Sequence, residues 1–246
     1  MDRNLYVAMS GAKQTLLAQA SNSNNLANAN TVGFRADLDQ FRAMPVLGPG
    51  YPTRVYALVE RPGVNFTHGA LQPTGRDLDV AVKGDGWIAV QAKDGAEAYT
   101  RAGDLRISPE GLLQTSSGLP VLGNGGPIAI PDAEKLEIGS DGTISVIPVG
   151  QNSTTLAVID RIKLVSPSAD QLVKGNDGLL HLKGGGELDP SDNIGLVSGR
   201  LESSNVNAVE AMVNMIELAR QFELQVKMMK TVDENSSTTA QMMRVA

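Results

Sequence analysis

The stretch from residue 206 to 243 contains neither glycine nor proline, and it constrains the fold more than any other feature of the chain. At 1.5 Å per residue a helix of this length would extend about 57 Å. Mean helices in globular proteins are only about 11–12 residues long. Cap residues precede the stretch at Ser203, Ser204 and Asn205. Apolar side chains recur along it at steps of three and four, namely Val206, Val209, Val213, Ile216, Ala219, Phe222, Val226 and Met229. A stripe this long predicts a coiled coil or a helical assembly, the alternative being a long helix packed on its own domain.

A second, narrower helical pattern occupies the other end of the chain, from residue 5 to about 29. Its stripe consists of Leu5, Met9, Ala12, Leu16, Ala20, Ser23 and Ala27. Most of these side chains are small, so a partner helix can approach closely. Five asparagines then crowd into residues 22–30. Asparagine is a mediocre helix former, because its amide competes for backbone hydrogen bonds. The local pattern alone therefore predicts a frayed helix end that runs into a turn at Val32 and Gly33.

The middle of the chain predicts β-structure. Short runs rich in valine, isoleucine and leucine alternate there with Asp-Gly and Asn-Gly pairs, which supply the positive φ that tight hairpins need. The expected strands lie at residues 79–82, 87–91, 136–138, 143–147 and 162–165. Residues 35–77 contain five prolines and predict a long extended connector with one strand at residues 53–60.

These patterns together predict an α+β protein. A discontinuous helical-hairpin or coiled-coil domain is formed by both termini, and an all-β domain is inserted between them. The expected parts are an N-terminal helix within residues 1–34, the connector at 35–77, the β-rich domain at 78–202 and the C-terminal helix within 203–246.

The sequence offers little material for catalysis. It has no cysteine and two histidines, His68 and His181, which gives poor odds of a zinc site or a triad. It lacks a G-x-S-x-G elbow and a phosphate-binding loop, and the net charge of −6 comes without a basic stripe for nucleic acid. No apolar run of 18 residues predicts a membrane span. We therefore expect a non-enzyme with no catalytic residues, no cofactor and no metal.

Motifs at both ends resemble the rod, hook and hook-associated group of bacterial flagellar axial proteins, in particular the basal-body rod protein family. The N-terminal motif is Ser23-Asn24-Asn25-Leu26-Ala27-Asn28 followed by Asn30-Thr31-Val32-Gly33-Phe34-Arg35. The C-terminal motif comprises Asn205, Val206, Val209, Met212, Val213, Ile216, Arg220, Phe222 and Glu223. Between them, residues 78–87 and 98–104 match the same group in order. The chain length and the Val232–Asn235 segment resemble the proximal-rod branch more than the distal-rod branch.

The resemblance implies a function and an assembly. It implies a structural rod subunit whose terminal helices pair into an inner domain, called D0, and stack with other rod proteins and with itself. The β-rich middle would form an outer domain, D1. The resemblance also implies export through the flagellar type III apparatus without signal cleavage, a location in the rod across the periplasm, and a role in motility. Asn25, Asn28, Thr31 and Gly33 are expected to cap and turn the chain out of D0.

Three alternatives remain open from the sequence. The first is a distal-rod protein of the same family. The second is a secreted carbohydrate-binding or polysaccharide-active protein with coiled-coil ends, although a single tryptophan and four tyrosines disfavour it. The third is an export chaperone or assembly scaffold that is absent from the finished structure.

Overall fold

The computed structural model describes residues 4–45, 55–148 and 156–245, and the chain divides into two compact units. Unit 1 gathers three separate segments, Met1–Ala29, Ala36–Asn65 and Val206–Ala246. Unit 2 consists of Asn30–Arg35 and Phe66–Asn205. The expected mixture of helix at both ends and strands between them is confirmed. Among the described residues, no helix combines the length and the apolar character that a membrane crossing requires.

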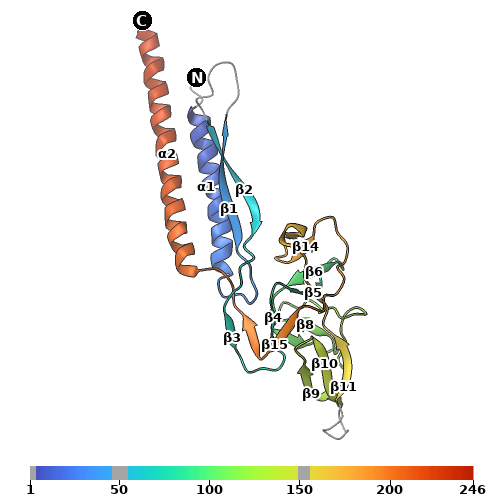
Figure 1. Ribbon diagram of the computed structural model, residues 1–246. Helices are drawn as coiled ribbons and strands as arrows, with labels where there is room; N and C mark the ends of the chain where they lie inside the picture. The colour runs from blue at the N-terminus through green and yellow to red at the C-terminus, as the bar shows by residue number, and fades with distance from the viewer. Residues whose placement is uncertain (1–3, 46–54, 149–155, 246) are drawn as a thin grey trace. The chain divides into compact units, whose positions relative to one another are not determined.

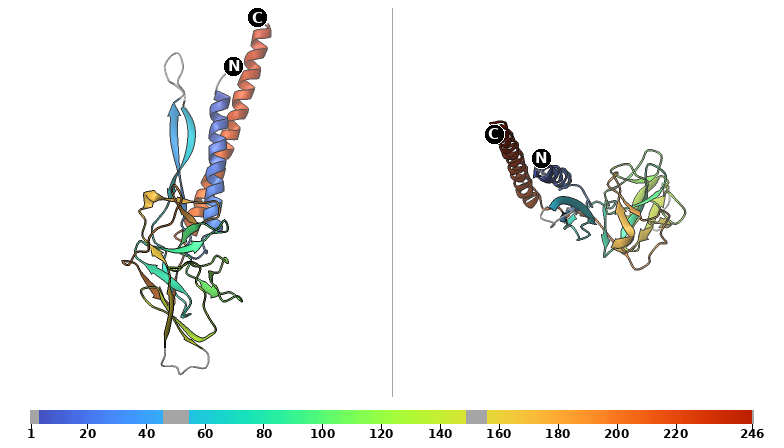
Figure 2. Two further views of the ribbon diagram at one scale, coloured as in Figure 1. Left: turned by 90° about the vertical axis from the view of Figure 1, so that its right-hand side faces the viewer. Right: turned by 90° about the horizontal axis from the view of Figure 1, so that it is seen from above.

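Unit 1 contains two helices and a β-hairpin. Helices α1 (Asn4–Ala27) and α2 (Ala208–Val245) lie side by side and run in opposite directions (Figures 1 and 2). Strands β1 (Asp37–Pro45) and β2 (Val55–Val64) pair antiparallel, with a bulge between Leu38 and Gln40. The hairpin packs against α1, where the Ser10 hydroxyl donates to the carbonyl of Ala57 at 3.2 Å.

The hairpin differs from the expectation for this part of the chain. The sequence predicts an extended connector over residues 35–77 with one strand at residues 53–60, of which 53 and 54 lie outside the described residues. The predicted strand corresponds to β2, and the structure pairs it with a second long strand, β1, that was not predicted. Most side chains of β1 are exposed, so neither face of the strand needs to be apolar. Its sequence accordingly shows no clear alternation of apolar and polar residues. The sequence therefore carries no period-two signal by which β1 could be recognised.

Helix α1 buries a face that shares only Ala12 with the stripe that its sequence predicts. The side chains that become buried are small ones, namely Ala8, Ala12, Thr15, Ala18 and Ser21. Leu5, Met9 and Leu16 from the predicted stripe remain 38–53% exposed. Small side chains allow close approach within unit 1: a Cβ added at Gly11 would lie 3.0 Å from the amide of Gln225 on α2. The helix thus packs through its small side and leaves its larger apolar side exposed.

Helix α2 also presents apolar side chains on two sides. Ala211 is buried, and Phe222, Val226 and Met229 are partly buried. The predicted stripe is only partly covered, because Val209, Val213 and Ile216 stay exposed. Steps of three outnumber steps of four in this stripe, so on a helix with 3.6 residues per turn it winds around the axis. One partner on one side cannot cover all of it.

Unit 2 is built from short antiparallel strands around one apolar core. Its largest sheet has the order β12-β5-β6-β14-β13, and a three-stranded sheet has the order β11-β10-β9. The fully buried core side chains include Ile88, Val90, Leu113, Ile144 and Ile162. The bounds are β3 (Leu71–Pro73), β4 (Val80–Lys83), β5 (Trp87–Gln91), β6 (Glu97–Thr100), β7 (Leu105–Ile107), β8 (Leu113–Thr115), β9 (Ala133–Ile138), β10 (Thr143–Pro148), β11 (Ala157–Arg161), β12 (Leu164–Val165), the 3-10 turn Ala169–Gln171, β13 (Leu172–Lys174), β14 (Leu180–Leu182), β15 (Gly195–Ser198) and β16 (Arg200–Glu202).

The turn signals of the sequence mark real hairpins in unit 2. Gly95 joins β5 to β6, Gly142 joins β9 to β10, and Gly178 joins β13 to β14, each with a φ of +80° to +87°. A side chain at such a φ would be strained, which is why glycine follows aspartate at each of these turns.

The packing of α1 predicts the effect of enlarging its small side. Ala12→Leu places three extra carbons at a position that is 5% exposed, so it should lower the free energy of unfolding by about 1–3 kcal/mol. Lys13→Leu introduces the same residue at the next, exposed position and should change it by less than about 0.5 kcal/mol. Urea unfolding followed by circular dichroism at the helix band measures both variants. An equal loss of unfolding free energy in the two variants would contradict the burial of Ala12 within unit 1.

Candidate functional site

The first candidate surface is a strip of exposed apolar side chains on α2, which we call the outer face. It consists of Val209, Met212, Val213 and Ile216, which are 50–71% exposed. Their spacing of three, four and seven residues places them together on one side of the helix. Exposed apolar side chains that are contiguous in this way mark sites of protein–protein contact, whereas scattered ones need no explanation.

Charge is distributed unequally between the units. Unit 1 contains nine basic and nine acidic residues, whereas unit 2 contains 12 basic and 18 acidic residues. The whole net charge of −6 therefore belongs to unit 2. Copies of unit 1 can approach each other without net repulsion, while copies of unit 2 repel one another when their surfaces face.

The asparagines near the end of α1 tie unit 1 together. The side-chain amide of Asn25 donates to the carbonyl of Asp37 at 2.9 Å, and its carbonyl accepts from the Asp37 N–H at 2.9 Å. This pair of bonds copies the pairing between two strands and attaches the start of β1 to α1. Asn22 donates to the carbonyl of Ala211 at 2.7 Å and so connects α1 to the first turns of α2. The side chain of Asn28 donates to the carbonyl of Asn24 at 2.9 Å within the last turn of α1.

The remaining residues of the two motifs occupy different environments. Thr31 is exposed, Gly33 is buried with a φ of +68°, and Phe34 is partly buried. In the C-terminal motif, Val206 and Phe222 are partly buried in unit 1, and Arg220 and Glu223 are exposed on α2. Of the N-terminal motif, Asn24 and Ala27 are exposed and Leu26 is partly buried. Asn25 and Asn28 thus form hydrogen bonds within unit 1, whereas Gly33 and Asn205 belong to unit 2.

A buried cluster of charges in unit 2 was not anticipated from the sequence. We call it the Glu202 cluster, and it consists of Glu202, Arg35, Arg101, Trp87 and His68. Glu202 lies between the two guanidinium groups, with its Oε1 2.5 Å from Arg35 Nη2 and its Oε2 2.7 Å from Arg101 Nη1. All three charged side chains are 3% exposed or less. Both guanidinium groups also lie over the ring of Trp87, at 5.7 and 5.2 Å from its centroid. Cation–π contact of this kind favours the charged form of arginine.

The backbone around the cluster is fitted tightly. The N–H of Gly69 donates to Glu202 Oε1 at 2.9 Å, and Arg101 Nε donates to the carbonyl of Gly86 at 2.9 Å. A Cβ at Gly33 would lie 2.3 Å from the backbone of Arg101, so this position admits no side chain. The glycine at position 33 is a local hint of the cluster, whereas residues 35, 101 and 202 are far apart in sequence.

Electrostatics keep Glu202 charged. Burial on its own would raise the pKa of the Glu202 carboxyl, but Arg101 and Arg35 outweigh it and hold that pKa below its ordinary value. Burial also lowers the pKa of the Arg35 guanidinium, against the opposing effect of Glu202. The three groups thus depend on each other, because removing one leaves a buried charge without its counterion.

His68 borders the cluster and is half exposed. Its Nδ1 lies 2.8 Å from Arg101 Nη1, and its Nε2 lies 2.9 Å from Asp85 Oδ1. Because a guanidinium group only donates, Nδ1 must accept and the ring hydrogen must sit on Nε2.

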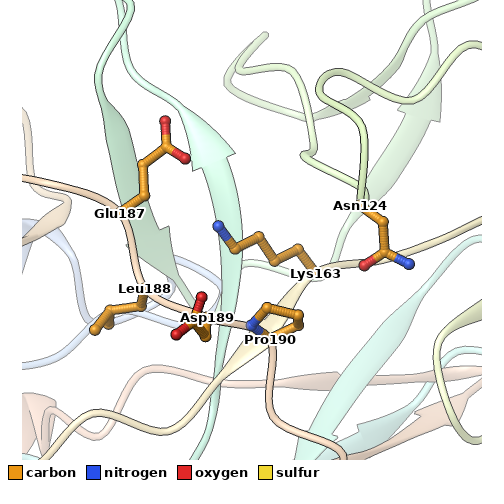
Figure 3. Close-up of a pocket in the computed structure, with 6 residues that line it drawn as sticks. All are labelled: Asn124, Lys163, Glu187, Leu188, Asp189 and Pro190. Atoms are coloured by element: carbon orange, nitrogen blue, oxygen red, sulfur yellow. The ribbon is translucent and has the colours of Figure 1, made fainter.

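A shallow pocket of about 220 Å³ lies elsewhere in unit 2 (Figure 3). Figure 3 shows Glu187, Leu188, Asp189 and Pro190 along one stretch of chain, facing Lys163 and Asn124. The ammonium group of Lys163 is already paired with Glu97 at 2.7 Å, so it is not available to fix a ligand. Within the described part of the chain, no group of three or more metal-ligating side chains is found.

Comparison with known proteins connects all three parts of the chain to one group. The family model for flagella basal body rod proteins matches residues 5–35, the model for the D1 domain of flagellar hook proteins FlgE/F/G matches residues 81–146, and the model for the C-terminal part of flagellar basal body rod FlgEFG proteins matches residues 197–242. The chain is 43% identical to the flagellar basal-body rod protein FlgF of Escherichia coli and 44% identical to that of Salmonella typhimurium, over the full length of both proteins. It is 33% identical to the flagellar basal-body rod protein FlgG of Bacillus subtilis, over 95% of this chain and 96% of that protein.

The depressed pKa of Glu202 predicts how stability depends on pH. A carboxyl whose pKa is lower in the folded state stabilises the fold fully above its unfolded pKa of about 4.3, and loses this effect as pH falls through the folded pKa. At pH 7, Glu202→Gln should lower the free energy of unfolding by about 3–5 kcal/mol. The difference from the unsubstituted protein should shrink below about pH 4, because the carboxyl takes up a proton in the unfolded state at a higher pH than in the folded state.

The measurement is urea unfolding at a series of pH values, followed by fluorescence of Trp87, the only tryptophan in the chain. Glu137→Gln provides the matched control, because Glu137 is 49% exposed in its pair with Lys135. The control should follow the unsubstituted protein throughout. A constant difference between Glu202→Gln and the unsubstituted protein down to pH 3 would contradict the assigned charge state.

Proposed function

The chain belongs to the flagellar basal-body rod protein family and is a structural subunit of the rod, and on that premise we propose that its two terminal helices assemble the rod while its β-rich unit decorates it. The outer face of α2 is the observation that carries this proposal. Four apolar side chains that are half or more exposed are left for other subunits to cover. Covering them would gain about 25 cal/mol for each Å² removed from water.

Two further observations support helix-driven assembly. Unit 1 carries equal numbers of basic and acidic residues, so neighbouring helical units meet without net repulsion. The larger apolar side chains of α1, including Leu16 and Leu17, are also exposed, at 48% and 45%. Both helices thus pair inside one subunit through one side and keep a second apolar side for neighbours.

We assign domains on the same basis. The inner domain D0 comprises the helical parts of residues 1–34 and 203–246, paired as a discontinuous coiled coil, and D1 comprises residues 78–202. Residues 35–77 connect them and include the hairpin of β1 and β2. Within D0, Asn25 and Asn28 fasten the end of α1, and Val209, Met212, Val213 and Ile216 contact neighbouring subunits.

The assembly geometry follows from which surfaces meet. A contact between two different surfaces of the same kind of subunit generates an open helical filament when the rotation it imposes does not close a ring. Such a filament has the form of a rod across the periplasm that supports motility. We propose that the subunit contacts itself and other rod proteins there, and that it reaches the rod unfolded through the type III export apparatus without a cleaved signal.

The subunit is proposed to act without catalysis. The curated relatives carry names of rod proteins, which favours a structural role over a carbohydrate-active enzyme or a temporary scaffold. The FlgF proteins of Escherichia coli and Salmonella typhimurium match at 43% and 44% identity, against 33% for the FlgG of Bacillus subtilis, which favours the proximal over the distal part of the rod.

A charge placed on the outer face tests the proposal. Ile216→Glu introduces a carboxylate at a side chain that is 63% exposed, so the free subunit should keep its stability within about 0.5 kcal/mol. In an assembly that buries this position the carboxylate would be desolvated without a partner, and incorporation should fail. Complementation of a cell that lacks its own copy of this subunit measures the effect, by swimming in soft agar and by the subunit content of purified basal bodies.

Gln221→Glu is the matched control, since it introduces the same side chain at an exposed position on another side of α2. It should swim and incorporate as the unsubstituted chain does. Normal incorporation of Ile216→Glu would overturn the assignment of the outer face as an assembly surface.

A further inference from the structure

Two short stretches of chain pair with each other inside unit 2. One is Asn30–Arg35, which follows α1, and the other is residues 200–205, which lead to α2. The N–H of Gly33 donates to the carbonyl of Glu202 at 2.8 Å, and the N–H of Asn205 donates to the carbonyl of Phe34 at 3.3 Å. Helix α1 ends six residues before Gly33, and α2 begins six residues after Glu202. This pairing therefore limits how far apart the two helix ends can lie.

Side chains reinforce the pairing from four parts of the chain. Arg35 belongs to the first stretch, Glu202 to the second, and Arg101 follows β6. Lys174 adds to the hold on the first stretch, because its ammonium group donates to the carbonyl of Arg35 at 2.8 Å and lies 4.0 Å from the ring centroid of Phe34. The two stretches are thus fixed to the β-structure of unit 2 as well as to each other.

The Glu202 cluster joins residues that are far apart in sequence. Arg35 and Glu202 are 167 residues apart, and Arg101 and Glu202 are 101 residues apart. The Glu202 cluster includes contacts with Gly69, Gly86 and Trp87, so its full set of contacts requires these parts of unit 2 to be in their final places.

We propose that the Glu202 cluster is a clasp that holds together the two stretches leading to the terminal helices, and that closes only once unit 2 has folded. Arg35 and Glu202 are then positioning residues for assembly. The proposal rests on the proposed role of the terminal helices, and it adds that a subunit becomes competent for the rod only after its β-rich unit is complete.

A simpler account would make the cluster an ordinary stabiliser of unit 2. Arg35 separates the two accounts, because Arg101 still pairs with Glu202 when Arg35 is replaced. Arg35→Met should therefore loosen the stretch Asn30–Arg35 while the core of unit 2 stays closed. Arg161→Met is the matched control, since it removes an arginine of the same unit whose partner, Asp192, is 85% exposed.

The test uses the full chain and measures hydrogen exchange at individual amides. In Arg35→Met the amides of Gly33 and Asn205 should exchange at least about tenfold faster, while those of Leu113 and Val121 in the core should stay within about twofold of the unsubstituted protein. The same variant should lose most of its incorporation into basal bodies and its swimming. Arg161→Met should change none of these readouts. Arg35→Lys keeps the charge without the planar fork, and should restore part of the protection and of the swimming.

Two results would overturn the proposal. In the first, the core amides of Arg35→Met accelerate as much as Gly33 and Asn205, which makes the cluster a general stabiliser. In the second, Gly33 and Asn205 lose protection but incorporation stays normal, which shows that assembly does not need the clasp. If Arg35→Met does not fold, the same comparison is made in Arg35→Lys. Failure of the proposed function would be seen separately, as normal incorporation of Ile216→Glu.

Discussion

A negative charge buried at Glu202 is the constraint on which unit 2 depends. Removing a carboxylate from water costs several kcal/mol even after the surroundings relax, so the fold must provide compensating groups. It does so with two guanidinium groups, one from a stretch that enters unit 2 after α1 and one from the chain after β6. The face of Trp87 and nearby carbonyl groups accommodate the excess positive charge. The N-terminal stretch Asn30–Arg35 is thereby part of the β-rich unit, although it lies next to a helix in sequence.

In the helices of unit 1, the size of a side chain decides whether it is buried. On α1, Ala8, Ala12 and Ala18 are buried, while Leu16 and Leu17 are exposed. A close approach between elements favours the small side chains, and the larger ones gain more when a neighbouring subunit covers them. The split of charge fits the same division, with a neutral helical unit and an acidic β-rich unit. One chain thus combines surfaces that favour association with surfaces that oppose it.

The asparagine-rich segment shows how a poor helix former can be useful. Asn25 uses both ends of its amide on the backbone of Asp37, and Asn22 reaches the backbone of Ala211. An amide offers a donor and an acceptor on a short side chain, which suits it to bond a neighbouring backbone. The tendency to compete for backbone hydrogen bonds, which predicts fraying from the local pattern, is here directed at other segments of unit 1.

The sequence by itself determined the two long helices, five of the strands and several turns of the middle, and the family. The stretch at residues 206–243, which lacks glycine and proline, agrees closely with α2, and Asp-Gly pairs lie at hairpin turns. Both could be predicted because helix length and turn type depend on residues that are close together in sequence. Only the tertiary structure decided which faces are covered. Periodicity finds an apolar stripe such as Leu5, Met9 and Leu16, but it cannot say whether the partner is in the same chain or in a neighbouring subunit. The hairpin of β1 and β2 and the Glu202 cluster could not be predicted either. Each is formed by contacts between separate segments of the chain, and the sequence of those segments shows no pattern that predicts the contact.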